Sequence, residues 1–100
     1  MKSMAYVYIF KLPHGGKAQY DSVAEQLRKE GVDNPVGRLY HFAGPMDSGW
    51  QITDIWESKE HFEEFQKNVL LPILERLHIQ MPTFEVSTAD IMLDNTQKKT

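Results

Sequence analysis

The sequence contains no cysteine. This absence excludes disulfides, thiolate metal sites, iron–sulfur ligation and a cysteine nucleophile, and it is typical of a reducing compartment. No apolar run approaches the roughly 18 to 20 residues that span a membrane. The N-terminal stretch MKSMAYVYIF also lacks the charged, apolar and small-residue order of a signal peptide. We therefore expect a cytoplasmic protein without a membrane partner.

An excess of positive charge is also missing. The chain has 11 Lys and Arg against 14 Asp and Glu, a formal net charge of -3 at pH 7, which gives no electrostatic basis for binding nucleic acid. Phosphate-binding glycine motifs and histidine pairs at metal-ligand spacing are absent, so we expect no metal site. A length of 100 residues with 41% hydrophobic and 25% charged residues is ordinary for a globular chain. We expect one domain over 1–100, with a core at about 4–93 and a polar tail at 94–100.

Six segments show regular patterns of apolar residues. Runs rich in β-branched and aromatic residues predict strands, whereas apolar residues at i, i+3, i+4 and i+7 predict amphipathic helices. In chain order the segments are a strand at 4–12, a helix at 16–31, strands at 36–44 and 49–57, a helix at 59–77 and a strand at 82–93. This β-α-β-β-α-β order predicts an α+β, ferredoxin-like domain, with a four-stranded antiparallel sheet and both helices on one face.

Local signals predict where the helices begin and end. The apolar stripe of the first helix consists of Tyr20, Val23, Ala24 and Leu27. Gly31 is a typical residue after a helix C-terminus, and Ser58 is a typical N-cap for the second helix. Pro72 lacks a backbone donor inside the second helix. We expect a kink there, or a break into a short helix that starts near Leu71.

The predicted sheet is apolar on both faces. The first strand places Ala5, Val7 and Ile9 on one side and Tyr6, Tyr8 and Phe10 on the other. A sheet with one face in water normally alternates apolar and polar residues more cleanly. Since the helices cover only one face, a homodimer with two sheets packed face to face is the simplest way to cover the second. The alternative is a monomer whose aromatic residues reflect strand propensity alone.

The order of the elements, the stretch DIWES at 54–58 and the spacing of Phe62 and Phe65 resemble the dimeric α/β-barrel proteins, and within them the antibiotic-biosynthesis-monooxygenase-like group. The resemblance extends over about residues 4–93. It implies a barrel across the dimer and a pocket between each sheet and its helices. The implied activities are cofactor-independent oxygenation of aromatic polyketide-type substrates, isomerisation and haem degradation, and many members have no established activity.

The haem-degrading branch of that group uses an asparagine on the first strand, a tryptophan on the third strand and a histidine on the second helix. Trp56 is a candidate for the tryptophan. The first strand has no asparagine, and His61, the histidine candidate, lies in the first turn of its helix. The comparison disfavours that branch, so we expect no haem and no other cofactor.

His41 and Asp54 are the candidate catalytic residues because they lie in the middle of neighbouring predicted strands. A hairpin symmetric about residues 45–48 pairs His41 with Ile52 and Leu39 with Asp54. His41 and Asp54 are then diagonal neighbours on one face, roughly 7 to 8 Å apart at Cα. A slip of one residue would put them on opposite faces.

A histidine oriented by a carboxylate can act as a general base toward a phenol or a carbon next to a carbonyl. The resulting carbanion can react with dioxygen without a cofactor, as in a monooxygenase, or be reprotonated elsewhere, as in an isomerase. The predicted contacts to an aromatic or carbonyl metabolite are Trp50, Trp56, Tyr8 and Phe62. The sequence leaves open whether the chain is an enzyme. The alternative is a non-catalytic ligand-binding or stress-related homodimer with a structural His–Asp pair.

Overall fold

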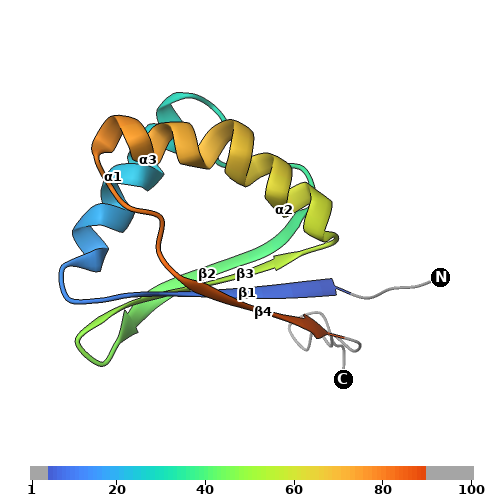
Figure 1. Ribbon diagram of the computed structural model, residues 1–100, viewed down its shortest axis with the longest axis horizontal. Coiled ribbons are helices and arrows are strands. Elements are labelled where there is room, and N and C mark those ends of the chain that lie inside the picture. The colour runs from blue at the N-terminus through green and yellow to red at the C-terminus, as the bar shows by residue number, and fades with distance from the viewer. Residues whose placement is uncertain (1–4, 90–100) are drawn as a thin grey trace, which may run out of the picture.

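The computed structural model describes residues 5–89. Strands β1 (Ala5–Leu12), β2 (Arg38–Met46), β3 (Gly49–Trp56) and β4 (Phe84–Ala89) form one antiparallel sheet in the order β2-β3-β1-β4. Helices α1 (Gly16–Lys29), α2 (Lys59–Phe65) and α3 (Leu71–Leu77) lie on one face of this sheet (Figure 1). The predicted ferredoxin-like α+β arrangement is confirmed. Over the described residues, no helix has the length and apolar character needed to cross a membrane.

The ends of the helices follow the predicted signals. Gly31 has a φ of 71°, a conformation in which glycine is not penalised. This backbone lets Val32 N–H donate to the Leu27 carbonyl at 3.0 Å, which closes the C-terminus of α1. At the start of α2, the Ser58 hydroxyl oxygen accepts a hydrogen bond from His61 N–H at 3.0 Å.

Pro72 is accommodated by a wider turn. Between α2 and α3 the chain forms a π-helical turn, η1 (Gln66–Leu70), and Leu71 N–H donates to the Gln66 carbonyl five residues earlier. A proline ring crowds the turn that precedes it, and a π turn gives the backbone more room. The expected short helix therefore begins at Leu71, and α2, η1 and α3 form one continuous arch over the sheet (Figure 1).

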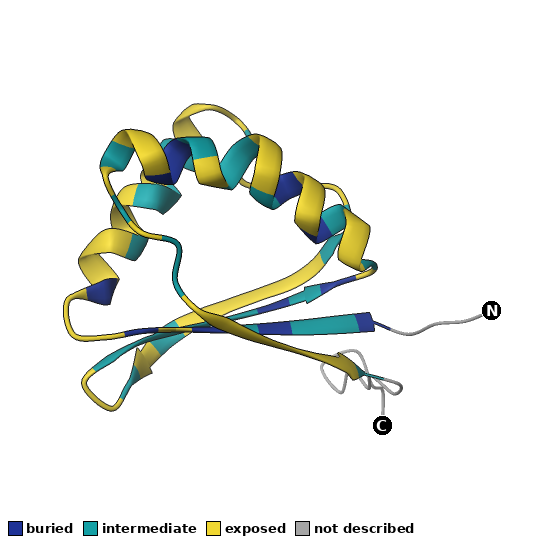
Figure 2. Ribbon diagram, viewed as in Figure 1, coloured by how far each residue is buried: buried dark blue, intermediate teal, exposed yellow. Residues whose placement is uncertain are grey.

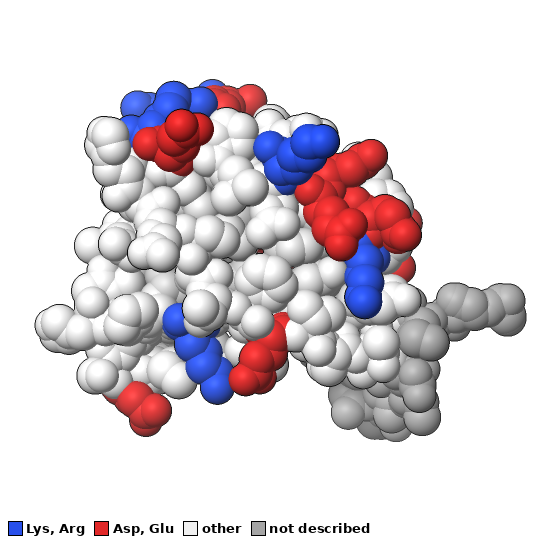
Figure 3. Space-filling model, in the orientation of Figure 1, with Lys and Arg blue, Asp and Glu red and all other residues white. Residues whose placement is uncertain are grey.

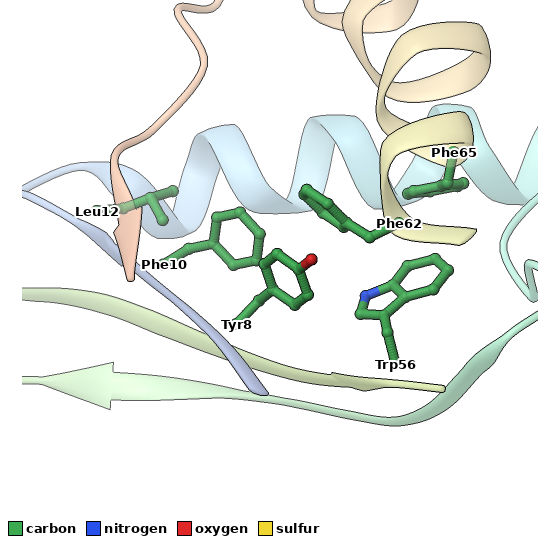
Figure 4. Packing of buried hydrophobic residues seen from close by; sticks show 6 residues of the cluster. All are labelled: Tyr8, Phe10, Leu12, Trp56, Phe62 and Phe65. Carbon is green, nitrogen blue, oxygen red and sulfur yellow. The ribbon is translucent and has the colours of Figure 1, made fainter. Parts of the chain in front are cut away.

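The hydrophobic core lies between the sheet and the α2 end of this arch. Figure 4 shows its cluster, which consists of Tyr8, Phe10, Leu12, Trp56, Phe62 and Phe65. The rings of Tyr8 and Phe62 stack at 4.1 Å between centroids, and Trp56 is fully buried. Helix α1, by contrast, has only Gly16 buried, and Figure 2 shows the rest of that helix as intermediate or exposed. The loosely packed element is thus α1, whereas α3 buries Ile73 and Leu74.

The β2–β3 hairpin corrects the predicted register. Strand β2 runs to Met46, which pairs with Gly49, so only Asp47 and Ser48 form the turn. The prediction treated residues 45–48 as the loop and ended the strand at residue 44. The shorter loop adds Pro45 and Met46 to the strand. Proline is tolerated there because β2 is an edge strand, where a missing backbone donor need not break a ladder hydrogen bond. From Tyr40 onward the partner of each β2 residue therefore moves by two positions, and these side chains keep their faces. Arg38 lies before an irregularity in the strand and does not follow this shift.

The sheet face that points away from the helices is apolar, and no other described helix or strand of residues 5–89 covers it. Val7 pairs with Ile55, and Ile55 pairs with Tyr40, so the three side chains share this face. Ile9 and Phe42 both pair with Thr53, so they lie on the same face in the next row. Phe42 is 55% exposed and Tyr40 is 41% exposed. The second apolar face predicted from the sequence is present.

Candidate functional site

A cavity of about 600 Å³ lies between the sheet and the helices. Its volume is in the usual range for small-molecule sites, about 300 to 1,000 Å³. The predicted apolar stripe of α1 forms one wall, because Tyr20, Val23, Ala24 and Leu27 all line the space. Phe62 and Phe65 of α2 form the opposite wall. The loose packing of α1 is therefore what opens the cavity.

His41 and Asp54 meet at this cavity. They are direct partners across β2 and β3 rather than diagonal neighbours, as the two-residue turn requires. His41 Nδ1 lies 2.6 Å from Asp54 Oδ1, and both residues line the cavity. The side chain of Asp54 is only 8% exposed, against 29% for His41. The predicted contact between His41 and Asp54 exists, but it arises from direct pairing across the two strands and not from the predicted diagonal arrangement.

Asp54 has a second neighbour that explains why a carboxylate is tolerated in the core. Trp56 Nε1–H donates to Asp54 Oδ2 over a long distance of 3.4 Å. An isolated buried carboxylate is costly, whereas one with two donors is largely compensated. Because a carboxylate can only accept, His41 Nδ1 carries the hydrogen of the His41–Asp54 bond. In the neutral ring, His41 Nε2 is then the acceptor.

Tyr20 of α1 occupies that acceptor position. Its hydroxyl lies 2.7 Å from His41 Nε2, and its ring stacks with the imidazole at 5.9 Å between centroids, with an angle of 8° between the planes. The three side chains therefore form a hydrogen-bonded chain in which Tyr20 donates to His41 and His41 donates to Asp54. Tyr20 was not among the predicted site residues, because its position in an amphipathic stripe is equally typical of a core residue.

The surroundings change the acidity of the Tyr20 hydroxyl. Burial raises the pKa of Tyr20 above its ordinary value, and the negative charge of Asp54 raises it further. The positive charge of Arg38 acts in the opposite direction and lowers this pKa. A phenol with a raised pKa stays protonated at neutral pH, so Tyr20 can donate to His41 and also receive a proton from a ligand as it gives up its own.

The other predicted site residues lie at different depths. Phe62 lines the cavity, whereas Tyr8 and Trp56 belong to the core cluster behind it and are not among the lining residues. Trp50 lies beside the site, with its ring 5.6 Å from that of Tyr20. The Trp50 Nε1–H group is buried and has no hydrogen-bond acceptor within residues 5–89.

The acidic side chains of α2 lie away from the cavity, whose lining includes Arg28, Arg38 and Asp54. In Figure 3, acidic residues gather over α2 at the upper right, while much of the surface between helices and sheet is uncharged. Within residues 5–89, no three His, Cys, Asp or Glu side chains are grouped so as to hold a metal ion. The acidic face of α2, which includes Glu60, Glu63 and Glu64, is exposed to solvent. Such a face favours solubility.

Solved structures share this fold. A mutant of SnoaB, a cofactor-independent oxygenase from Streptomyces nogalater, matches with a TM-score of 0.53 and 17% identity over 91% of this chain and 94% of that one. A mutant of MhuD with two manganese protoporphyrin IX bound per active site matches with a TM-score of 0.55 and 15% identity, over 92% and 97%. A conserved protein of unknown function from Bacteroides thetaiotaomicron, a possible oxidoreductase, matches with a TM-score of 0.55 and 10% identity, over 91% and 100%.

The chain has the ferredoxin-like fold of these structures. No protein-family model matches its sequence, and no curated protein matches it significantly. At identities below about one in five residues, the comparison defines the architecture and leaves the chemistry to be argued from the site. This agrees with the resemblance seen in the order of the elements, and the cavity between sheet and helices lies where that resemblance implies a pocket.

Proposed function

We propose that the chain is a small-molecule enzyme that removes a proton from an aromatic or carbonyl metabolite without a bound cofactor. One observation carries the proposal, namely the hydrogen-bonded chain of Tyr20, His41 and Asp54 at the wall of an aromatic cavity. A buried carboxylate that orients a histidine is a common arrangement for general base catalysis. Here it is directed at a space large enough for a small metabolite.

In this proposal the proton passes through Tyr20. The Tyr20 hydroxyl already occupies His41 Nε2, so His41 has no free lone pair to offer a ligand in this arrangement. The Tyr20 oxygen accepts the proton of the substrate as its own proton moves to His41 Nε2. Asp54 then stabilises the imidazolium through Nδ1. The products are a substrate carbanion or phenolate and a protonated His41, so one proton is transferred in total.

The carbanion has two fates. Return of the proton to a different carbon gives an isomerisation. Reaction with dioxygen gives a hydroperoxide, and loss of water from that hydroperoxide leaves a new carbonyl. For the tricyclic ketone anthrone the balance is anthrone plus dioxygen to anthraquinone plus water, so dioxygen is the oxidant and no external reductant is needed. The fold shared with the oxygenase SnoaB supports testing the second route.

The same contacts support a second reading, a non-catalytic ligand-binding homodimer. Asp54 already has donors in both His41 and the Trp56 indole, so a structural role accounts for its burial. Under this reading Phe62 still contacts a ligand in the cavity, with Trp50, Trp56 and Tyr8 supporting it from beside and behind. The two readings differ only in whether a proton leaves the bound molecule.

We further propose that the chain forms a homodimer through the open face of the sheet, which would give the dimeric α/β barrel. The supporting observation is the row of apolar side chains on that face, with Phe42 at 55% exposure and Tyr40 stacked on it at 6.1 Å. A second copy of the same face is self-complementary under two-fold symmetry. Sedimentation at several concentrations tests this, and a monomer throughout would contradict it.

The enzyme proposal is tested with anthrone in deuterated buffer without oxygen. The protein should accelerate deuterium incorporation at the methylene carbon above the buffer rate, as followed by NMR. His41→Asn and Asp54→Asn should each lower the accelerated rate by about 10² or more, the usual contribution of general acid–base catalysis. Oxygen uptake under air then separates oxygenation from simple exchange.

His78→Asn is the matched control, since His78 is exposed at the end of α3. It should leave the exchange rate unchanged. If anthrone binds but its exchange rate equals the buffer rate, or if His41→Asn exchanges as fast as the unmodified protein, the enzyme proposal fails. Binding without exchange would favour the ligand-binding alternative.

A further inference from the structure

The irregular start of β2 places an arginine on the cavity side of the sheet. Arg38 pairs with Trp56 and Tyr40 pairs with Ile55, so Leu39 is an extra residue in the strand. Such a bulge re-aims the side chains before it. Because Trp56 and Asp54 share the helix-facing side of β3, the bulge brings Arg38 to the same side as His41, three residues later. Arg38 accordingly lines the cavity.

The backbone around Arg38 is firmly held. Gly37 has a φ of 94°, and a Cβ at this position would collide with the ring of His61. The Gly37 carbonyl accepts a hydrogen bond from Glu57 N–H at 2.8 Å. Arg38 Nη2–H donates to the Asp33 carbonyl at 2.8 Å, which fixes one side of the guanidinium. The side chain is therefore oriented before any ligand arrives.

Among the described residues, no carboxylate forms an ion pair with Arg38 within 4.0 Å. Arg28, the other arginine of the cavity wall, is paired with Glu25 at 3.1 Å. A guanidinium has five N–H donors, and only one of those of Arg38 has an acceptor in the described residues. Arg38 is therefore a half-buried cation at a cavity lined partly by aromatic side chains, and its remaining N–H groups can bind a ligand.

We propose that the ligand of this cavity is an aromatic or carbonyl compound that bears a carboxylate, and that Arg38 binds this carboxylate. The proposal rests on the function proposed above and names the substrate class of the same site. A planar guanidinium matches the two oxygens of a carboxylate through parallel N–H donors. Such a contact fixes one end of the molecule and presents the other end to Tyr20.

The position of Arg38 also suits the chemistry. Arg38 lowers the pKa of Tyr20 against the effects of burial and Asp54, so its charge acts at the hydroxyl that receives the proton. A substrate that already carries a negative charge resists a second one. The guanidinium offsets that first charge and stabilises the carbanion or phenolate as it forms. Anchoring and charge compensation thus come from one residue.

Binding of two probes of the same shape tests the substrate class. Naphthoate and naphthamide differ in charge at one group, and calorimetry measures their affinities without turnover. The unmodified protein should bind naphthoate at least about tenfold more tightly, the scale of a charge-assisted hydrogen bond. Arg38→Gln should remove this preference. Arg28→Gln is the matched control and should keep it.

Equal affinities for the two probes, no naphthoate binding at millimolar concentration, or a preference that survives Arg38→Gln would each overturn the proposal. So would loss of the preference in Arg28→Gln by the same factor. If circular dichroism shows that Arg38→Gln is unfolded, Arg38→Lys decides. It keeps the charge without the planar pair of donors, so it should lose most of the preference, and full retention overturns the proposal.

The two proposals fail separately. His41→Asn should keep the naphthoate preference while it loses anthrone exchange, because His41 acts in proton transfer and Arg38 in binding. If anthrone exchange depends on His41 and naphthoate is not preferred, the substrate class is wrong and the enzyme function stands. If naphthoate is preferred through Arg38 and no exchange occurs, the cavity binds carboxylates without this chemistry.

Discussion

Replacement of Tyr20 by phenylalanine tests how the proton reaches His41. The change removes one oxygen, the one 2.7 Å from His41 Nε2, and keeps the ring that stacks on the imidazole and lines the cavity. If the proton passes through Tyr20, the exchange rate of anthrone should fall by about 10² or more. If His41 meets the substrate directly, the variant frees Nε2 and the rate should hold or rise. A fall of about 10² or more and the absence of any fall are therefore easy to distinguish.

The effect on stability should be small by comparison. A hydrogen bond of this kind contributes about 0.5 to 1.5 kcal/mol net, and partial exposure to water favours the lower end. One kcal/mol corresponds to a melting shift of about 4 to 8 °C for a domain of this size. Tyr20→Phe should therefore melt only a few degrees below the unmodified protein. A large loss of activity with a small loss of stability identifies a role in proton transfer.

The assay compares anthrone exchange and thermal melting in the same preparations. Tyr6→Phe is the matched control, because it also removes one phenolic oxygen but lies away from the cavity wall, with its ring near Lys59. Its exchange rate should equal that of the unmodified protein. An exchange rate in Tyr20→Phe within about twofold of the unmodified protein would refute the path through Tyr20 and leave His41 as the base in contact with the substrate.

Three further predictions follow from the core, the tyrosines and the open face. Phe62→Ala should lower the free energy of unfolding by about 3 to 5 kcal/mol in urea titrations, because the ring is 2% exposed. An equal loss in Phe84→Ala, where the side chain is 36% exposed, would contradict this account. Burial raises the pKa of both Tyr8 and Tyr20, so the folded state keeps their protons when the unfolded chain ionises near pH about 10. The free energy of unfolding should therefore fall as the pH rises above that value, and it should fall less steeply in Tyr20→Phe. An identical dependence of this free energy on pH in the variant would count against the raised pKa of Tyr20. Phe42→Asp should shift the sedimentation of a dimer to that of a monomer, and an unchanged dimer would exclude this face as the interface.

The sequence predicted the architecture well because its signals are local. Strand propensity, the stripe of α1, the glycine after it and the Ser58 cap each depend on neighbours within a few residues, and each appears as expected. The length of the β2–β3 turn was harder to predict, because Pro45 and Met46 look like loop residues and are tolerated in an edge strand. The predicted meeting of His41 and Asp54 survived, since a shift of two residues preserves the face.

Tyr20 and Arg38 were missed for a physical reason. Periodicity shows that the Tyr20 face of α1 points inward, but it does not show how closely α1 approaches the sheet. Only the tertiary spacing turns a core stripe into a cavity wall. Arg38 depends on one extra residue, Leu39, and no residue pattern at the start of β2 marks a bulge. The sequence therefore does not reveal the parts of the site that depend on the spacing between elements or on a single irregular strand position. The proposed proton path through Tyr20 depends on the first feature, and the proposed carboxylate contact of Arg38 depends on the second.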